Sequence, residues 1–222
     1  MQKLNKEIVD YINDVVLPQY NNFDQAHNQF HIKNVQKRSL EYFEFLNDPN
    51  LNINIVYVVA SYHDIGCKIQ RKNHPIYSGQ IVRGDGNLKK WFSDEEIELI
   101  AQACEDHSTS SGHDPRSIYG KIVSDADKDR DLEICLLRGW DFIDFHRPDM
   151  TFEEKVEDVR MELVKRFCDH SQGGKGLVKF YIKNEGNESF VQKMKECCLD
   201  VDNFKNTMLA AIEKRSENEN NN

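Results

Sequence analysis

The chain has 222 residues, of which 39% are hydrophobic and 30% charged, so one domain with a substantial core is expected. Its net charge of −9 disfavours binding along a nucleic-acid polymer. No apolar stretch of about 18 residues is present, so no membrane partner is expected. The acidic start MQKLNKEIVDYIND is unlike a signal peptide, and the six cysteines form no C-x-x-C pair, so we expect a cytoplasmic protein with reduced thiols.

The first part of the chain predicts helices, because apolar residues recur at helical spacing. One helix is expected from Leu4 to Val15, ending near Pro18, and a second carries His31 and ends before the Asp-Pro pair at 48 and 49. Residues 53–65, INIVYVVASYHDI, are apolar nearly all round. This pattern fits a central buried helix, although a run such as IVYVV is also compatible with a strand.

The remaining segments continue the helical pattern. Pro75 is expected to begin a helix that reaches about Val82, and Asp94 to begin another. Further helices are expected within SIYGKIVSDADKDRD and over 129–145, 152–170, 188–199 and 202–215. The chain ends in the polar sequence SENENNN. The sequence therefore predicts an all-α protein with one domain over 1–213 and a disordered tail over 214–222.

The adjacent pair His63 and Asp64 is the strongest local sign of chemistry. It ends an apolar segment, where two ionisable groups are costly to bury without partners. A metal ion removes that cost, because it stabilises the carboxylate and accepts the imidazole lone pair. Gly66 then permits a sharp turn of the chain. The alternative is a polar helix end at the surface.

Three segments in order resemble the signatures of the HD-domain metal-dependent phosphohydrolases. They are FDQAHNQFHIKNV (23–35), SYHDIG (61–66) and DADK (125–128). The segment HPIYS (74–78) and the sequence EDH (105–107) also fall where related members carry similar residues. The resemblance covers about residues 20–150. It implies an all-α HD-domain helical bundle that hydrolyses phosphoric esters.

The resemblance also implies a metal site with two imidazoles and two carboxylates, carried by His31, His63, Asp64 and Asp127. Such a mixed donor set suits one divalent ion, such as Mn, Ni, Co, Fe, Zn or Mg. Asp127 is preferred to Asp125 because Ala126, Asp127 and Lys128 match the family's Ala-Asp-Arg/Lys pattern. His27, four residues before His31, shares its helix face and is either a group that orients a ligand or a surface histidine.

Two departures from the family pattern bear on the activity. The nucleotidase branch has a glutamate three residues after the aspartate of the HD pair, and this chain has Cys67 there. Branches that bind two metals need additional histidines. The chain offers His107 for one of these positions and only Asp85 or nothing for the other, and it has no GYP motif. One metal ion is therefore expected.

The expected reaction is cleavage of a small phosphorylated metabolite, such as a nucleotide, by metal-activated water. Asp64 would hold that water, and His107 would contact the phosphate or protonate the leaving oxygen. The alternative for His107 is a histidine that faces the negative end of a helix dipole. A rim of basic side chains is expected to bind substrate, namely Lys68, Arg71, His74, Arg116 and Lys128. The expected assembly is a monomer or homodimer.

Three other functions fit the same residues. The first is a catalytically inactive HD module that binds a metal or nucleotide for regulation. The second is an HD oxygenase with two iron ions. The third is a helical interaction protein in which the histidines and aspartates are only surface groups.

Overall fold

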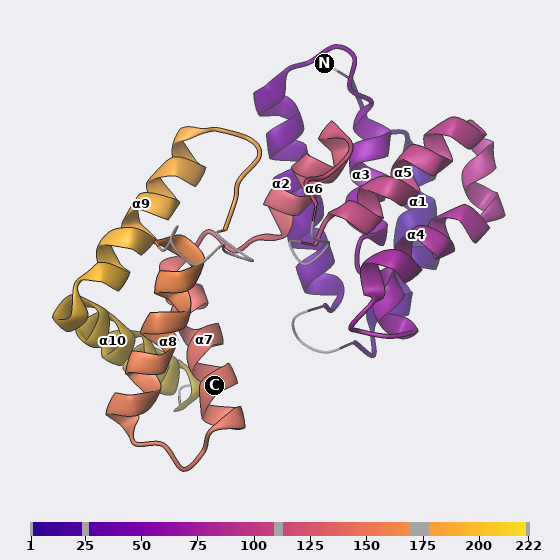
Figure 1. Ribbon diagram of the computed structural model, residues 1–222. Helices are drawn as coiled ribbons and strands as arrows, with labels where there is room; N and C mark the ends of the chain where they lie inside the picture. Colours follow the sequence, from indigo (N-terminus) through magenta and orange to yellow (C-terminus); the bar gives the residue numbers. More distant parts are fainter. Residues whose placement is uncertain (1, 24–26, 109–112, 169–177, 221–222) are drawn as a thin grey trace. The chain divides into compact units, whose positions relative to one another are not determined.

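The computed structural model describes residues 2–23, 27–108, 113–168 and 178–220 (Figure 1). All regular elements within these ranges are helices, which confirms the all-α prediction. In chain order they are α1 (Lys6–Tyr11), η1 (Ile12–Val16), η2 (Leu17–Tyr20), α2 (Gln29–Leu46), α3 (Ile53–Tyr62), η3 (Ile65–Lys68), α4 (His74–Gly84), η4 (Gly86–Lys90), α5 (Asp94–Asp106), α6 (Ile118–Asp127), α7 (Leu132–His146), α8 (Phe152–Phe167), α9 (Glu185–Leu199) and α10 (Val201–Asn220).

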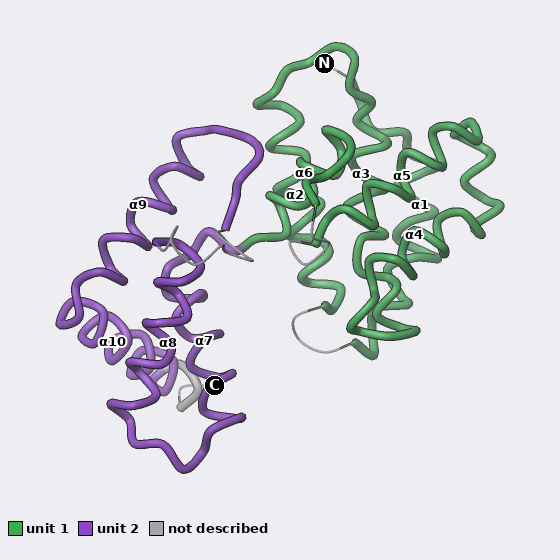
Figure 2. The backbone as a smooth tube through the Cα atoms, viewed as in Figure 1, with its two compact units in different colours: residues 1–128 green, residues 129–222 purple. Residues whose placement is uncertain are grey.

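The chain divides into two compact units, residues 1–128 and 129–222 (Figure 2). All residues that the sequence singles out for the site lie in the first unit. The single domain over 1–213 stays a prediction.

The second unit consists of α7 to α10. Their apolar faces enclose a core that includes Leu136, Leu163, Met194 and Phe204. The tail predicted to be disordered from 214 is helical as far as Asn220, and 221–222 lie outside the described residues. Two ion pairs join this part of the helix to α7: Lys214 bonds Glu133 and Arg215 bonds Asp141, each at 2.7 Å.

Helix α3 lies at the centre of the first unit and packs against α2, α5 and α6. Its residues are buried on every side, from Ile55 to Tyr62. This explains why the segment lacks a polar face, and the helical alternative is confirmed over the strand. The helix delivers the His63–Asp64 pair directly beyond its last turn, at the inner end of a buried element.

Capping side chains set where the other site helices begin and end. The Asn28 side chain accepts a hydrogen bond from the backbone N–H of His31 at 3.1 Å, so His31 lies in the first turn of α2. Ser93 and Glu96 form a reciprocal capping box at the start of α5. Ser117 caps α6, the helix that ends with Asp127.

Helix α4 passes very close to the turn after the HD pair, and Gly66 makes this possible. A Cβ at position 66 would overlap the carbonyl oxygen of His74 and lie 2.6 Å from the backbone nitrogen of Ser78. The glycine is therefore required by this close approach, which corrects the expectation that it serves to turn the chain. The Ser78 hydroxyl accepts from Gly66 N at 2.9 Å and donates to His63 O at 2.7 Å.

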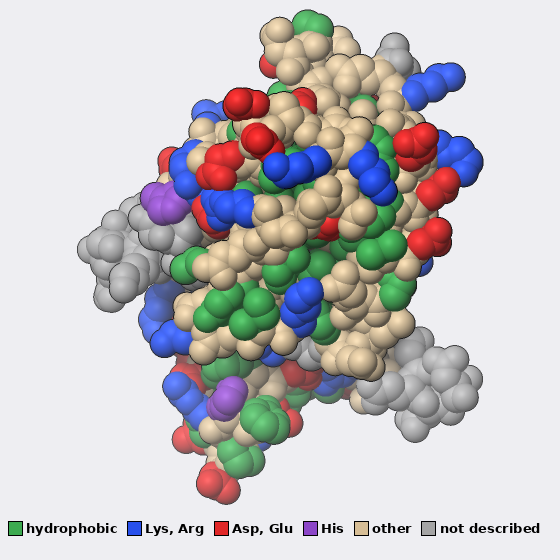
Figure 3. Space-filling model, turned by 90° about the vertical axis from the view of Figure 1, so that its right-hand side faces the viewer, with side chains coloured by type: hydrophobic (Ala, Val, Ile, Leu, Met, Phe, Trp, Pro, Cys, Tyr) green, Lys and Arg blue, Asp and Glu red, His purple; other side chains and the backbone are tan. Residues whose placement is uncertain are grey.

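Positive and negative side chains are mixed on the face shown in Figure 3, where apolar side chains lie between them. This face therefore has no continuous basic surface. None of the described helices is long and apolar enough to cross a membrane.

Candidate metal centre

Three segments of the first unit deliver the four predicted ligands to one place. His31 comes from the first turn of α2, His63 and Asp64 follow α3, and Asp127 ends α6. His31 Nε2 lies 3.3 Å from His63 Nε2, 3.3 Å from Asp64 Oδ2 and 3.1 Å from Asp127 Oδ1. His63 Nε2 lies 3.2 Å from Asp64 Oδ2 and 3.7 Å from Asp127 Oδ1. The predicted set is thus brought together, and we call it the first group.

A second group shares Asp64 but uses its other oxygen. His74 Nε2 lies 3.1 Å from Asp64 Oδ1, and His107 Nε2 lies 3.3 Å from the same oxygen. The two histidine Nε2 atoms are 3.1 Å apart. Both groups bring their donor atoms close enough to hold a metal ion. The Asp64 carboxylate therefore has one oxygen toward each group.

The hydrogen bonds of three of these histidines leave Nε2 to serve as the ligand atom. Nδ1 of His63 faces Ala60 O at 2.8 Å, Nδ1 of His74 faces Arg71 O at 2.8 Å, and Nδ1 of His107 faces Cys104 O at 2.7 Å. A carbonyl oxygen can only accept, so each Nδ1 carries hydrogen and the neutral ring has its lone pair on Nε2. Histidine ligands of metals are commonly oriented by such backbone contacts.

Charge in the cluster also favours a cation. Burial opposes the charged form of His63, but Asp64 and Asp127 outweigh it and raise the pKa of His63 to about 10. The pKa of Asp64 lies well below its usual range, since His63 and the hydrogen bonds from His107 and His31 outweigh its burial. Without a cation the cluster holds protons, and a divalent ion supplies the same positive charge with suitable directional bonds. The residues present therefore fit a metal ion.

The structure places Asp85 outside the ligand cluster and His74 within it. Asp85, considered for the additional position, accepts hydrogen bonds from the hydroxyls of Tyr11 and Tyr62, both at 2.6 Å. The residue that lies beside His107 and Asp64 is His74. It was expected among the substrate contacts, because its place in the sequence shows only a histidine that precedes a proline at a helix start.

The predicted basic rim is dispersed. Lys68 is exposed and donates to Gln19 at 2.8 Å, and Arg71 is also exposed. The Lys128 ammonium is buried against Asp125 at 3.0 Å and also donates to Ser124 O at 2.9 Å. Lys128 is thus a structural partner of Asp125 within α6, because the carboxylate would otherwise be buried without a counter-charge.

Arg116, another residue of the predicted basic rim, is paired with two carboxylates at the end of α5. Its guanidinium bonds Asp106 at 2.8 Å and Glu105 at 2.7 Å, so most of its charge is matched. Asp106 is fully buried, and it also accepts from the backbone N–H of Arg116 at 2.7 Å. This contact ties the segment after α5 to the end of that helix, next to His107.

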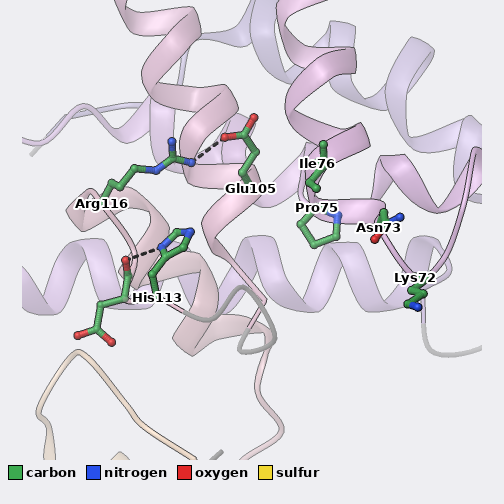
Figure 4. Close-up of a pocket in the computed structure, with 8 residues that line it drawn as sticks. Lys72, Asn73, Pro75, Ile76, Glu105, His113 and Arg116 are labelled. Carbon is green, nitrogen blue, oxygen red and sulfur yellow. Dashed lines mark hydrogen bonds and ion pairs between the residues drawn. The ribbon is translucent and has the colours of Figure 1, made fainter. Parts of the chain in front are cut away.

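Figure 4 shows a cavity of about 640 Å³ whose lining includes the sequence neighbours of His74 and His107. Glu105 and Arg116 line one side, together with His113, and the start of α4 lines the other. Its remaining lining residues are Lys72, Asn73, Pro75, Ile76 and Asp114. Asn73 and Pro75 flank His74 in the sequence. The cavity is therefore lined by the segment that carries His74. Lys72 was not predicted, because an exposed lysine is common and does not by itself indicate a site.

Residues 30–130 match the family model described as HD domain. This part of the chain therefore belongs to the HD-domain family, and the resemblance seen in the sequence is confirmed. The match includes both groups of candidate ligands. Neither the curated proteins nor the solved structures contain a match to the chain.

Proposed function

We propose that the protein is a metal-dependent phosphohydrolase that acts on a small phosphorylated molecule. The observation that carries this proposal is the convergence of His31, His63, Asp64 and Asp127 from three segments, with Asp127 Oδ1 at 3.1 Å from His31 Nε2. When bound, a divalent ion would polarise a phosphoryl oxygen and lower the pKa of a water molecule.

In this proposal the two groups of side chains bind metal ions. The first group holds the catalytic ion, and Asp64 connects it to the second group, in which His74 and His107 would hold another. In this proposal His107 is a ligand instead of a proton donor, since its Nδ1 hydrogen is committed to Cys104 O.

The cavity lined by the segment that carries His74 is the proposed entry for substrate. Lys72 provides a positive charge at its edge, whereas the charge of Arg116 is matched by Glu105 and Asp106. The Lys72 ammonium would reduce the repulsion between a phosphate and the acidic chain. Pro75 and Ile76 give the cavity an apolar wall, and Ile76 is 55% exposed. A phosphate joined to a partly apolar group, as in a nucleotide, fits this lining.

The second group also supports a different candidate function, an oxygenase with two iron ions. Both groups consist of histidine nitrogen and carboxylate oxygen, a donor set that iron accepts. Two iron ions per chain, together with consumption of oxygen and no phosphate release, would favour this candidate.

The test is a panel of nucleotides, sugar phosphates and simple phosphomonoesters, assayed for phosphate release with Mn²⁺, Ni²⁺, Co²⁺ or Fe²⁺. The matched control is His63→Ala, which removes one ligand of the first group. We expect cleavage of at least one substrate class by the wild type and loss of at least about a hundredfold in the variant. If no substrate is cleaved faster by the wild type than by His63→Ala, the proposal is wrong and a binding module is the better account.

A further inference from the structure

A third set of possible ligands lies beside the two groups and contains sulfur. It consists of His27, Asp64 and Cys67, whose donor atoms all lie within 4.8 Å of one another. His27 precedes α2, and Cys67 is in η3, three residues after Asp64. The His27 ring lies 6.3 Å from the His31 ring and 6.0 Å from the His74 ring, so it stands next to both groups.

This third set differs from the two groups in donor chemistry and in access. The first and second groups offer only nitrogen and oxygen, whereas the third offers one nitrogen, one oxygen and one sulfur. A thiolate ligand favours Zn²⁺ and softer ions strongly over Mn²⁺ or Mg²⁺. Asp64 is buried, but His27 and Cys67 are each partly exposed. An ion from solution can therefore reach the set.

We propose that His27, Asp64 and Cys67 form an inhibitory site for Zn²⁺ or a similar thiophilic ion. In tetrahedral zinc sites the bond lengths place neighbouring ligand atoms about 3.3–3.7 Å apart, so a modest side-chain rotation closes this set around an ion. Water or an external ligand would fill the fourth position. Binding releases the Cys67 thiol proton to solvent, and no oxidation or reduction takes place.

Inhibition follows from the shared carboxylate, and this consequence depends on the proposed function. Asp64 Oδ2 faces the first group and Oδ1 faces the second. A zinc ion bound at the third set would coordinate one of these two oxygens. The group that uses the same oxygen would then bind its metal ion with lower affinity. Zinc at this set and metal in the two groups therefore compete for Asp64.

The test uses Co²⁺ as a spectroscopic probe on the full-length, metal-stripped protein with its thiols reduced. Ligation by a thiolate gives Co²⁺ a near-ultraviolet charge-transfer band, which nitrogen and oxygen ligands do not give. We expect this band in the wild type, its loss in Cys67→Ser, and at least tenfold weaker binding in His27→Ala. Cys168→Ser, which alters a partly exposed thiol of the second unit, should keep the band. Saturating Mn²⁺ should reduce it.

Failure of this proposal is distinguishable from failure of the proposed function, because the band requires no turnover. Absence of the band in the wild type, or its persistence in Cys67→Ser, would overturn the site. For inhibition, the zinc concentration that halves the rate is measured for each enzyme against its own uninhibited rate. We expect it to rise at least tenfold in Cys67→Ser. An unchanged value would overturn the inhibitory role.

Discussion

The histidines of the centre owe their chemistry to short local contacts. His63, His74 and His107 each point Nδ1 at the carbonyl oxygen three residues earlier, so the same backbone device orients all three rings. It leaves the Nε2 atoms to converge near Asp64. A substitution of glutamine for any of these rings keeps polarity but loses this orientation.

Metal binding should depend on pH because His63 must lose a proton. In the metal-free protein the pKa of His63 is raised from 6.5 to about 10, so its ring is charged at neutral pH. Metal affinity should therefore increase as pH rises from about 6.5 to about 8.5, with protons released on binding. Calorimetry in buffers of different ionisation enthalpy measures this release. Equal affinity at both pH values and no proton release would contradict the assignment.

The same shift fixes the sign of a stability effect in the metal-free protein. Because the pKa of His63 is higher in the folded state, its protonation contributes stability that is fully present below about pH 6.5. That contribution is lost as pH rises through about 10. The free energy of unfolding of the metal-free protein, from urea titrations, should therefore fall over this range, whereas metal-loaded protein should be less sensitive.

Lys72 should contribute to substrate binding if the cavity is the substrate's entry. Lys72→Ala should raise KM about tenfold or more with a smaller change in kcat, as expected for loss of a charged hydrogen bond. Lys68→Ala is the matched control, because Lys68 bonds Gln19 and does not line the cavity. Equal KM values for the two variants would argue against this entry.

The ligands of the first group could be predicted from the sequence, but the partners of the nearby basic residues could not. The pair His63–Asp64 is informative locally, because two ionisable groups end an apolar run. By contrast, the pairing of Lys128 with Asp125 and of Arg116 with Asp106 depends on how side chains pack after folding. A basic residue near a ligand in the sequence therefore does not by itself identify a phosphate contact.

At the scale of elements, the approach of α4 to η3 determines where His74 lies. Gly66→Ala should destabilise the protein by about 1–3 kcal/mol, because the new methyl group meets the backbone of α4. Gly84→Ala, at the end of α4, is the control substitution, since a Cβ there meets nothing within 4 Å. It should be neutral or stabilising. Urea unfolding compares them, and equal losses would contradict the close-packing argument.

The helices themselves were largely predictable from apolar periodicity and capping residues. Ser93 and Glu96 mark the start of α5, and Pro75 lies in the first turn of α4. The π-helical turn η1 was not predictable, because apolar spacing does not separate it from a continuous α-helix. The α3 segment was ambiguous, because burial on every side removes the periodicity that distinguishes a helix from a strand.

At the scale of the whole molecule, the two units can be followed separately. The chain has two tryptophans, Trp91 in the first unit and Trp140 in the second. At a metal concentration of about a hundred times Kd, the free energy of unfolding of the first unit should rise by about 2.7 kcal/mol. The unfolding midpoint reported by Trp91 should therefore increase. It should leave the midpoint reported by Trp140 unchanged, because all the candidate ligands precede residue 129.

Fluorescence of Trp140→Phe and Trp91→Phe isolates the two signals. Equal shifts for both probes would show that the units unfold together, and no shift for either would count against metal binding in the first unit.

The most direct measurement for the whole account is metal content per chain by elemental analysis after purification and reloading. The wild type should retain at least one divalent ion, and His31→Ala and Asp127→Asn should each bind it at least tenfold more weakly. Asp85→Asn, in which a carboxylate bonded by two tyrosines is changed, should keep the wild-type content. Full metal content in Asp127→Asn and His31→Ala would contradict the claim that these side chains hold the ion.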